Sequence, residues 1–422
     1  MSKLQSPRGT ADLMPQDMAA HRHVMDTARA TAGLFGFEEM ATPIFEFTEV
    51  FARPLGESSD VVTKETYSFT DRGGEGLTLR PEGTAGVVRA LISAGLTQTL
   101  PQKFFYSGPM FRYERPQKGR MRQFHQVGVE LLGPTSPLAD AEVIALGARM
   151  LDRLGVLKNC RLHLNSLGDA ESRSGYREAL VDYLTAFKDD LSEDSQRRLT
   201  TNPLRILDSK NDGDKAILTN APSLADHLNA ASQDHFARVC ASLDAAGIRY
   251  HHDPKLVRGL DYYCHTAFEF ITQDLGAQGT VLGGGRYDGL VQTLGGPDVA
   301  GVGWAAGVER LALLANKAPR LEPPVFLISV DDSEKIENAM FILAQKIRGK
   351  GVRAEISFGR NLGKELKRAN KLGAPYVAMF VETIDKNSIA IELKNMEDGV
   401  QETINSDDLD RAADEICKPY LG

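Results

Sequence analysis

The stretch FRYERPQKGRMRQFHQ, residues 111–126, is the part of the sequence that says most about the fold. Strand-forming residues on both sides, at 103–113 and 123–132, predict two antiparallel strands joined by a basic connection. One acid, Glu114, stands among five cations: Arg112, Arg115, Lys118, Arg120 and Arg122. Most such charge runs are simply solvated. Here the nearby ring of Phe124 also suits a nucleotide, because arginine forks match phosphate oxygens and aromatic rings stack on bases.

Outward from this hairpin, hydrophobic patterning predicts further strands and helices. A helix is expected over residues 18–34 with Asp17 as its N-cap, followed by an extended stretch at 37–42 that ends at Pro43. The other predicted elements are a hairpin of strands 67–70 and 77–80, a helix over 82–94, and strands at 256–272, 279–285 and 301–307. Hairpins followed by helices are typical of an α+β domain built on an antiparallel sheet.

Two changes in composition along the chain predict its domain organisation. Residues 169–253 are polar and helix-rich, which predicts a helical insertion between two parts of the first sheet. A proline-rich stretch near 316–324 predicts a linker before a small α/β domain. The expected boundaries are 1–168 and 254–316 for the sheet-bearing core, 169–253 for the insertion, 317–324 for the linker and 325–422 for the last domain. Within that domain, strands are expected at 325–330, 376–381 and 388–393, with a helix over 333–348.

The overall composition narrows the class of protein. Of the 422 residues, 42% are hydrophobic and 25% charged, which is ordinary for globular proteins and excludes disordered and fibrous classes. The chain has no apolar run of about 18–20 residues and no secretory leader, so we expect a cytoplasmic protein without membrane contact. Its four cysteines form no C-x-x-C pair, and the pairs His21/His23 and His251/His252 lack metal-ligand spacing. Neither a disulfide framework nor a metal site is therefore expected.

Charge and glycine patterns bear on nucleotide partners. The net charge of −8 ordinarily counts against nucleic acid, but cations concentrate at 112–122 and 360–371, and local patches suffice for RNA binding. The glycine-rich stretches 283–289 and 301–307 each have one residue too many for the dinucleotide pattern G-x-G-x-x-G, and 359–364 misses the P-loop pattern. A bound nucleotide would therefore contact side chains and a sheet surface.

Residues 111–126 resemble motif 2 of the class II aminoacyl-tRNA synthetases in its histidyl form. Four further stretches resemble motifs of the same family: LRPEGT at 79–84, LVRGLDYY at 256–263, GGGRYDGL at 283–290 and GWAAGVERL at 303–311. One such motif would be weak evidence, whereas five in order over nearly the whole chain are strong. The resemblance implies an α+β fold with the antiparallel-sheet catalytic domain of class II synthetases, a helical insertion and a C-terminal α/β anticodon-binding domain.

The resemblance also implies an ATP site with Mg²⁺. Arg112 would hold the α-phosphate, and Arg258 would be an extra cation there that supplements Mg²⁺, which makes these two the expected catalytic residues. Fixed guanidinium groups suit that role because they stabilise charge on a reacting phosphate without reorganising. The expected ATP-binding residues are Arg112 at the α-phosphate, Glu114 at the adenine amino group, Phe124 on the adenine ring, Arg120 at the outer phosphates and Arg310 at the γ-phosphate.

For the amino acid, the resemblance implies a pocket of carboxylates and phenols. Glu130 and Tyr263 would bind the imidazole of histidine at its two nitrogens and would reject analogues that leave them unpaired. Taken alone, a glutamate at the end of a strand is usually just solvated. The joint occurrence of these positions is what favours binding. The expected histidine-binding residues are Glu82, Gly83, Thr84, Arg112, Gln126, Glu130, Arg258, Tyr262, Tyr263 and Tyr287.

The remaining expectations concern macromolecular partners. By resemblance, Arg115 and Gln117 would lie near the acceptor end of tRNA(His), and the insertion would grip the acceptor arm. The predicted helix at 18–34 and the strand before Pro43 match motif 1, which forms a homodimer interface in the family, although an amphipathic helix on a core would look the same. A cationic stretch at 358–371 would lie in the anticodon-binding domain, where an exposed charged helix is the alternative interpretation.

The implied activity is that of a ligase. Histidine and ATP would give histidyl-adenylate and pyrophosphate, and the histidyl group would pass to the 3′ end of tRNA(His). One alternative is a histidine-sensing regulatory subunit of ATP phosphoribosyltransferase, a non-catalytic relative that typically lacks the anticodon domain and has lost motif residues. Another is an RNA-binding module with a borrowed fold. The presence of Arg112, Arg258, Arg310 and a domain after residue 324 favours the enzyme.

Overall fold

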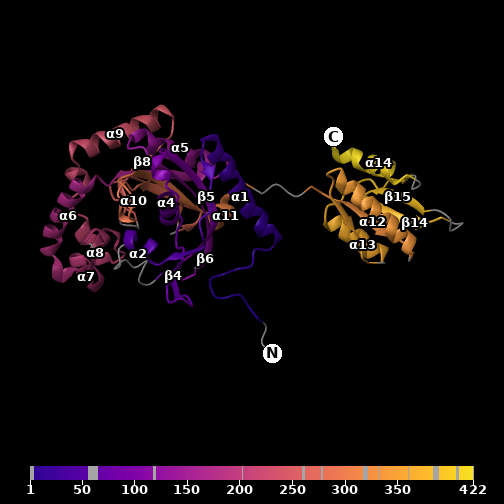
Figure 1. Ribbon diagram of the computed structural model, residues 1–422, viewed down its shortest axis with the longest axis horizontal. Coiled ribbons are helices and arrows are strands. Elements are labelled where there is room, and N and C mark those ends of the chain that lie inside the picture. Colours follow the sequence, from indigo (N-terminus) through magenta and orange to yellow (C-terminus); the bar gives the residue numbers. More distant parts are fainter. Residues whose placement is uncertain are drawn as a thin grey trace. The chain divides into compact units, whose positions relative to one another are not determined.

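The computed structural model shown in Figure 1 divides into two compact units, Met1–Ala318 and Pro319–Gly422. Each unit has its own sheet and its own hydrophobic core. The structure describes residues 4–55, 65–116, 120–201, 203–258, 262–276, 279–316, 322–331, 333–359, 361–383, 389–404 and 408–421.

The first unit is built on an eight-stranded sheet with the strand order β1-β5-β6-β11-β10-β9-β7-β8. Neighbouring strands are antiparallel except at the two edges, where β1 pairs with β5 and β7 pairs with β8 in parallel. The predicted α+β class and antiparallel sheet are thus confirmed. The strands are β1 (Glu38–Glu39), β5 (Gln102–Phe111), β6 (Gln123–Gly133), β7 (Cys160–Ser166), β8 (His251–His252), β9 (Cys264–Thr272), β10 (Thr280–Arg286) and β11 (Ala300–Gly307).

Strand alternation divides the sheet into a core face and a site face. On β6, Val127, Val129 and Leu131 enter the main core with residues of four helices: α1 (Pro15–Leu34), α5 (Pro137–Arg153), α9 (Ala230–Ala245) and α11 (Val308–Leu314). Gln126 and Glu130 alternate with these residues and therefore point to the other face. That face carries a second core with helices α4 (Thr84–Ser93) and α10 (Leu290–Thr293).

A helix-rich segment connects β7 to β8. It contains α6 (Ala170–Thr185), α7 (Glu193–Thr201), α8 (Asp212–Leu218) and α9, with the short 3₁₀ helices η3 (Lys188–Asp190), η4 (Pro203–Asp208) and η5 (Leu224–His227). Most of these helices lie to one side of the sheet in Figure 1, but α9 packs on α5 and contributes Val239 and Leu243 to the main core. The segment is therefore anchored to the sheet at its C-terminal end.

Smaller elements complete the first unit. A three-stranded sheet has the order β2-β4-β3, formed by β2 (Phe45–Phe47), β4 (Gly76–Leu79) and β3 (Tyr67–Thr70), beside helix α2 (Glu49–Leu55). Two further 3₁₀ turns are η1 (Leu96–Gln98) and η2 (Leu157–Asn159). Among the described helices of the whole chain, none has the length and apolar character needed to cross a membrane.

The second unit is an α/β domain around a five-stranded sheet with the order β13-β12-β14-β15-β16. Strand β12 pairs in parallel with β13 and β14, whereas β15 and β16 are antiparallel to their neighbours. Its elements are β12 (Val325–Ser329), α12 (Glu334–Gly349), β13 (Ala354–Ile356), α13 (Leu362–Lys371), β14 (Tyr376–Glu382), β15 (Ile389–Asn395), β16 (Gln401–Ile404) and α14 (Leu409–Leu421).

Three local predictions were wrong. Helix α1 begins at Pro15 with Met14 as its N-cap, so Asp17 lies inside the first turn, where its charge complements the helix dipole. Only Glu38–Glu39 of the extended stretch 37–42 pairs as a strand. Strand β9 begins at Cys264 instead of residue 256, and residues 256–258 are irregular. In this last case apolar and aromatic residues mimic a strand although they line a binding surface.

Candidate active site

Eleven of the residues expected to bind histidine or ATP line one cavity on the site face of the sheet. The cavity has a volume of about 210 Å³ and lies over β6, β10 and β11, with the irregular segment before β9 as one wall. The expected residues in its lining are Glu82, Thr84, Arg112, Glu114, Arg120, Phe124, Gln126, Arg258, Tyr262, Tyr263 and Arg310. Five stretches that are remote in sequence therefore converge on one place.

One end of the cavity is strongly cationic. Arg112 donates from Nε to the carbonyl of Pro81 at 2.9 Å, and its guanidinium lies 5.3 Å from the centre of the Phe124 ring. Arg310 donates from Nη1 to the carbonyl of Thr280 at 2.6 Å. Burial, followed by repulsion from Arg120, lowers the pKa of Arg310. A half-buried guanidinium beside like charges is an arrangement that a polyanionic ligand would stabilise.

Glu114 forms ion pairs with two arginines of this cationic cluster. Its carboxylate forms an ion pair with Arg120, and the nearest oxygen lies 4.0 Å from Nη1 of Arg112. The side chain is only 9% exposed. The carboxylate therefore holds two of the expected phosphate ligands in place at the end of the hairpin.

Arg258 stands at the opposite wall, where it forms an ion pair with Glu269. Glu269 also accepts a hydrogen bond from the hydroxyl of Thr280 at 2.7 Å. The guanidinium lies 5.2 Å from the centre of the Tyr263 ring, and its Nε is buried with no hydrogen-bond partner among the described residues. It passes so close to Gly283 that a Cβ there would come within 2.8 Å of Nη1, so a side chain at this position would displace the guanidinium.

Glu130 is fully buried behind the lining of the cavity, which it reaches through Thr84. It accepts hydrogen bonds from the hydroxyl of Thr84 at 2.7 Å and from the hydroxyl of Tyr287. Burial raises the pKa of Glu130 to about 8. Because no described cation pairs with it, Glu130 holds a proton below about pH 8, and a bound ligand with a cationic or N–H group would favour the carboxylate form that accepts a hydrogen bond.

Glu82 and the turn that carries it are ordered by main-chain hydrogen bonds. Its carboxylate accepts from the amides of Thr84 at 2.5 Å and Ala85 at 2.8 Å, at the start of α4. Burial raises the pKa of Glu82 as well. The Gly83 backbone lies against the ring of Tyr106, where a Cβ would come within 2.2 Å, so the turn can lie flat on this tyrosine.

The structure also shows residues that the sequence alone did not assign to the site. Tyr106 packs beneath Gly83, as just described. Arg286 forms a fully buried ion pair with Asp140 of α5 and holds the strand end that carries Tyr287. Glu309 accepts from the backbone amide of His125 at 2.8 and 3.0 Å and so ties α11 to β6. Neighbouring positions in the motifs were the available signal, but these roles depend on tertiary contacts.

Of the two residues expected at the tRNA acceptor end, only Arg115 lies among the described residues, and it does not line this cavity. Arg115 is exposed beyond the end of β5. Gln117 lies outside the described residues. Three residues expected in the histidine pocket are not part of the cavity lining: Gly83, which packs on Tyr106, and Glu130 and Tyr287, which are hydrogen-bonded to each other.

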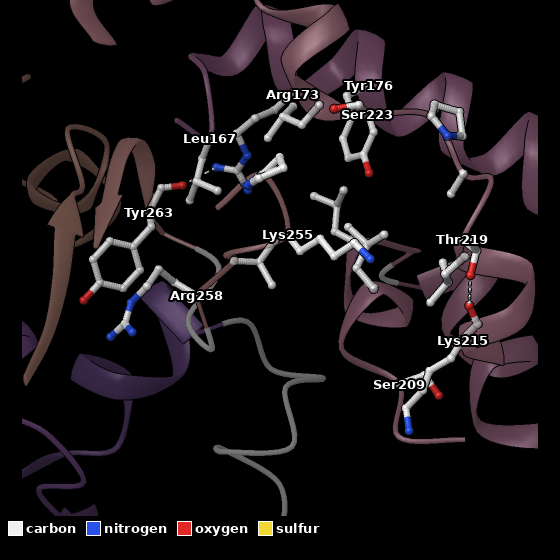
Figure 2. Close-up of a pocket in the computed structure, with 18 residues that line it drawn as sticks. Leu167, Arg173, Tyr176, Ser209, Lys215, Thr219, Ser223, Lys255, Arg258 and Tyr263 are labelled. Carbon is white, nitrogen blue, oxygen red and sulfur yellow. Dashed lines mark hydrogen bonds between the residues drawn. The ribbon is translucent and has the colours of Figure 1, made fainter. Parts of the chain in front are cut away.

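A second and larger cavity, of about 630 Å³, lies between the helix-rich segment and the residues that precede β9. Arg258 and Tyr263 line both cavities. In Figure 2 the guanidinium of Arg258 turns to the ring of Tyr263, whereas Lys255 extends into the larger cavity. Arg173 of α6 donates to the carbonyl of Tyr263 at 2.8 Å, which joins the helical segment to the wall of the site. The smaller cavity holds the convergent carboxylates, whereas the described residues that line the larger one include no carboxylate.

Comparison with known proteins agrees with this geometry. The histidyl-tRNA synthetase family profile matches residues 9–311, and that of the anticodon binding domain matches residues 324–415. Histidine–tRNA ligase of Rhodospirillum rubrum is 56% identical over 408 residues, which cover 96% of this chain and 97% of the relative. The chain belongs to the histidyl-tRNA synthetase family. It is therefore an ATP-using aminoacyl-tRNA synthetase, as the motifs predicted.

Further relatives of this histidyl-tRNA synthetase family member support the assignment. Histidine–tRNA ligase of Synechococcus elongatus is 50% identical over 97% of this chain and 94% of its own length. The apo crystal structure of Staphylococcus aureus histidyl-tRNA synthetase is 36% identical, covers 97% of this chain and 99% of its own, and superposes with a TM-score of 0.80. A Bacillus halodurans protein described as ATP phosphoribosyltransferase regulatory subunit/histidyl-tRNA synthetase has only 21% identity at a TM-score of 0.64, a likeness of fold alone.

Proposed function

We propose that this chain activates L-histidine with ATP in the 210 Å³ cavity and then transfers the histidyl group to the 3′ end of tRNA(His). The observation that carries this proposal is a cluster of arginines in the cavity lining together with a buried carboxylate just behind it, Glu130, which bonds to Thr84 of the lining and pairs with no described cation. The carboxylate suits a ligand that donates from a ring nitrogen, and the arginines suit a polyphosphate.

Histidine binds at the floor of the site. Glu130 accepts the N–H of the imidazole, and Tyr263 and Tyr262 enclose the ring. Gln126 has a buried side-chain oxygen without a partner, which makes it a suitable acceptor for the α-ammonium group, together with Glu82 and Thr84. A ligand without both imidazole nitrogens would leave buried polar groups unpaired, which is the physical basis of selection.

ATP binds at the cationic end. Its adenine stacks on Phe124, its α-phosphate lies between Arg112 and Arg258, and its outer phosphates contact Arg120 and Arg310. Attack of the histidine carboxylate on the α-phosphorus forms the acyl–phosphate bond and releases pyrophosphate. The guanidinium groups stabilise the added negative charge in the transition state, and positioning supplies the rest.

Mg²⁺ would enter with ATP. The carboxylates that line the cavity are already engaged, Glu82 by two amides, Glu114 by Arg120 and Glu309 by the amide of His125. Glu114, which lies beside the arginine cluster and pairs with Arg120, would be the protein carboxylate that helps to hold the ion with the phosphates of ATP. The ion would supply neutralisation of phosphate charge.

The tRNA contacts extend over the whole chain in this proposal. Arg115 and Gln117 contact the acceptor end, residues 169–253 form the insertion that grips the acceptor arm, and residues 325–422 read the anticodon after a linker at 317–324. Residues 1–168 and 254–316 form the catalytic core. Arg173 is already used internally by the carbonyl of Tyr263, so we expect tRNA phosphates to contact other cations of the insertion.

The working form is a cytoplasmic homodimer. Large apolar side chains are exposed near the end of α1 and on the three-stranded sheet, a pattern typical of a contact surface. They are Leu34, Ile44, Phe45, Phe47 and Phe69, with exposures from 45% to 72%. Sedimentation should find a dimer of the wild type and a monomer of a variant with Phe45→Glu and Phe47→Glu. A dimer that persists in that variant would contradict this surface.

The experiment that tests the activity is histidine-dependent exchange between ATP and pyrophosphate. Exchange with histidine and with no other amino acid is expected. Arg258→His should lower kcat/KM on the order of 10²–10³-fold, because it removes a fixed cation from the reacting phosphate. Arg197→His, at an exposed pair with Asp194, is the matched control and should leave exchange unchanged. Absence of exchange would favour the regulatory-subunit alternative.

A further inference from the structure

One group of potential metal ligands lies among the described residues, and none of its members has been assigned above as a ligand of an ion. It consists of His21, His125 and Glu309, whose ligand atoms all lie within 4.8 Å of one another. They come from three elements, α1, β6 and α11, that pack together on the core face of the sheet. Their separation along the chain is why no metal-ligand spacing was visible in the sequence.

His21 provides the second, independent observation. Its side chain is only 5% exposed, and its Nδ1 is buried without a hydrogen-bond partner. The ring packs edge-on against that of His125, with centroids 5.5 Å apart. A buried ring nitrogen that lacks a partner costs free energy unless something binds to it.

The other two ligands are already oriented. Both carboxylate oxygens of Glu309 accept from the amide of His125, and Oε1 also lies 2.9 Å from Nδ1 of His125. The side chains of His125 and Glu309 are 22% and 19% exposed, so water can reach the group. Glu309 also lines the active-site cavity, which gives an ion a route of entry.

We propose that His21, His125 and Glu309 form a site for a divalent transition-metal ion of the Zn²⁺ type. Two imidazoles with one carboxylate are a donor set that Zn²⁺ prefers and Mg²⁺ does not. Zn²⁺ at ~2.0–2.1 Å from each ligand needs ligand atoms roughly 3.3 Å apart, so small side-chain rotations bring the three into range. The ion replaces the proton shared by Nδ1 of His125 and Glu309, and water completes the tetrahedron. Bound there, it links α1 to the strand and helix that carry Phe124 and Arg310.

The test is titration of the full-length, untagged protein with Zn²⁺ alone, followed by calorimetry. We expect one tight equivalent per chain in the wild type. His21→Phe keeps the volume of the ring and removes its nitrogens, and should weaken that equivalent at least ~100-fold, more than the ~10–100-fold typical of losing an indirect partner. His23→Phe, two residues along α1 and outside the group, is the matched control and should bind as the wild type does.

A second measurement needs no variant. Co²⁺ added at one equivalent to the wild type should give the intense visible absorption of a four-coordinate ion with nitrogen ligands, and Zn²⁺ should remove it. If His21→Phe fails to fold by circular dichroism, His21→Gln serves in its place. The proposal is overturned if the wild type binds no equivalent of Zn²⁺, if either His21 variant binds it unchanged, or if the Co²⁺ spectrum is that of the hydrated ion.

Discussion

Two arginine–carboxylate pairs of the first unit, Arg286–Asp140 and Arg258–Glu269, differ in burial and in what surrounds them. Arg286 and Asp140 are both fully buried, and Arg286 further donates to the carbonyls of Pro134 and Ser136 and to Asp288. Arg258 and Glu269 are 16% and 17% exposed at the edge of the cavity, and one nitrogen of Arg258 has no partner among the described residues. A guanidinium whose N–H donors are all bonded within the protein stabilises the fold. One with an unused N–H donor at a cavity is available to a ligand.

The largest expected effect is the loss of stability when the Arg286–Asp140 pair is broken. Arg286→Met leaves the carboxylate of Asp140 buried without its main partner and should lower the unfolding free energy of the first unit by ~3–5 kcal/mol. Differential scanning calorimetry on the full chain would measure this as a lower melting temperature of the first unit. Arg197→Met, at a pair that is more than 60% exposed, should change it by less than ~1 kcal/mol. Equal stability of the Arg286 variant and the wild type would contradict the structural role.

The second pair should give the opposite pattern. Arg258→Met is expected to lower the kcat/KM of histidine-dependent exchange on the order of 10²–10³-fold while the calorimetric transition moves little, because Glu269 stays partly hydrated and keeps its bond from Thr280. The comparison fails if this variant loses stability as Arg286→Met does, or if it retains full exchange.

Glu130 extends the comparison to a buried carboxyl group that is bonded to two hydroxyl groups and pairs with no described cation. Its pKa is about 8 in the folded chain against an ordinary value near 4.5, so the folded chain holds a proton that the unfolded chain has lost over that interval. The resulting stabilisation is complete below about pH 4.5 and is lost as the pH rises to about 8. Without substrates, Glu130→Gln should therefore gain thermal stability relative to the wild type between pH 5.5 and pH 8.5, although its exchange activity falls. A pH-independent difference in melting temperature would contradict the raised pKa.

The smallest effect concerns the space beside Arg258. Gly283→Ala places a methyl group within 2.8 Å of Nη1 of Arg258. Because the arginine side chain can shift, we expect the clash to cost only ~1–3 kcal/mol. The displaced guanidinium should lower the rate of exchange about tenfold. Gly284→Ala is the informative neighbour, since its methyl group would meet the carbonyl of Gly303 at 2.1 Å and should lower stability instead. Interchanged effects would mean that the two glycines had been assigned the wrong roles.

The sequence was most informative where several motifs constrain one another. Glu130 would be an ordinary strand residue by itself, and only its occurrence with Thr84 and Tyr287 in family motifs indicated a pocket. The structure brings these three into contact through hydrogen bonds. The family and the fold class were predicted in this way and are confirmed, whereas the roles of the individual residues stay predictions.

What the sequence missed depends on contacts between distant segments. Nothing local in Arg286 or Glu309 distinguishes a buried tie from a surface charge, since the partners are Asp140 and the amide of His125. The early start predicted for β9 failed for a related reason. Aromatic residues such as Tyr263 favour strands in general, but here their burial comes from the walls of two cavities.

Strand β6 has a consequence for how such an enzyme can change. Gln126 and Glu130 lie on the face of the sheet that carries the cavity, and Val127, Val129 and Leu131 lie on the other face in the main core. Alternating residues of this one strand therefore serve the site and the hydrophobic core. Substitutions on the site face can change which amino acid is selected while the residues on the core face keep the fold stable. Selectivity can therefore evolve at this strand without a loss of stability.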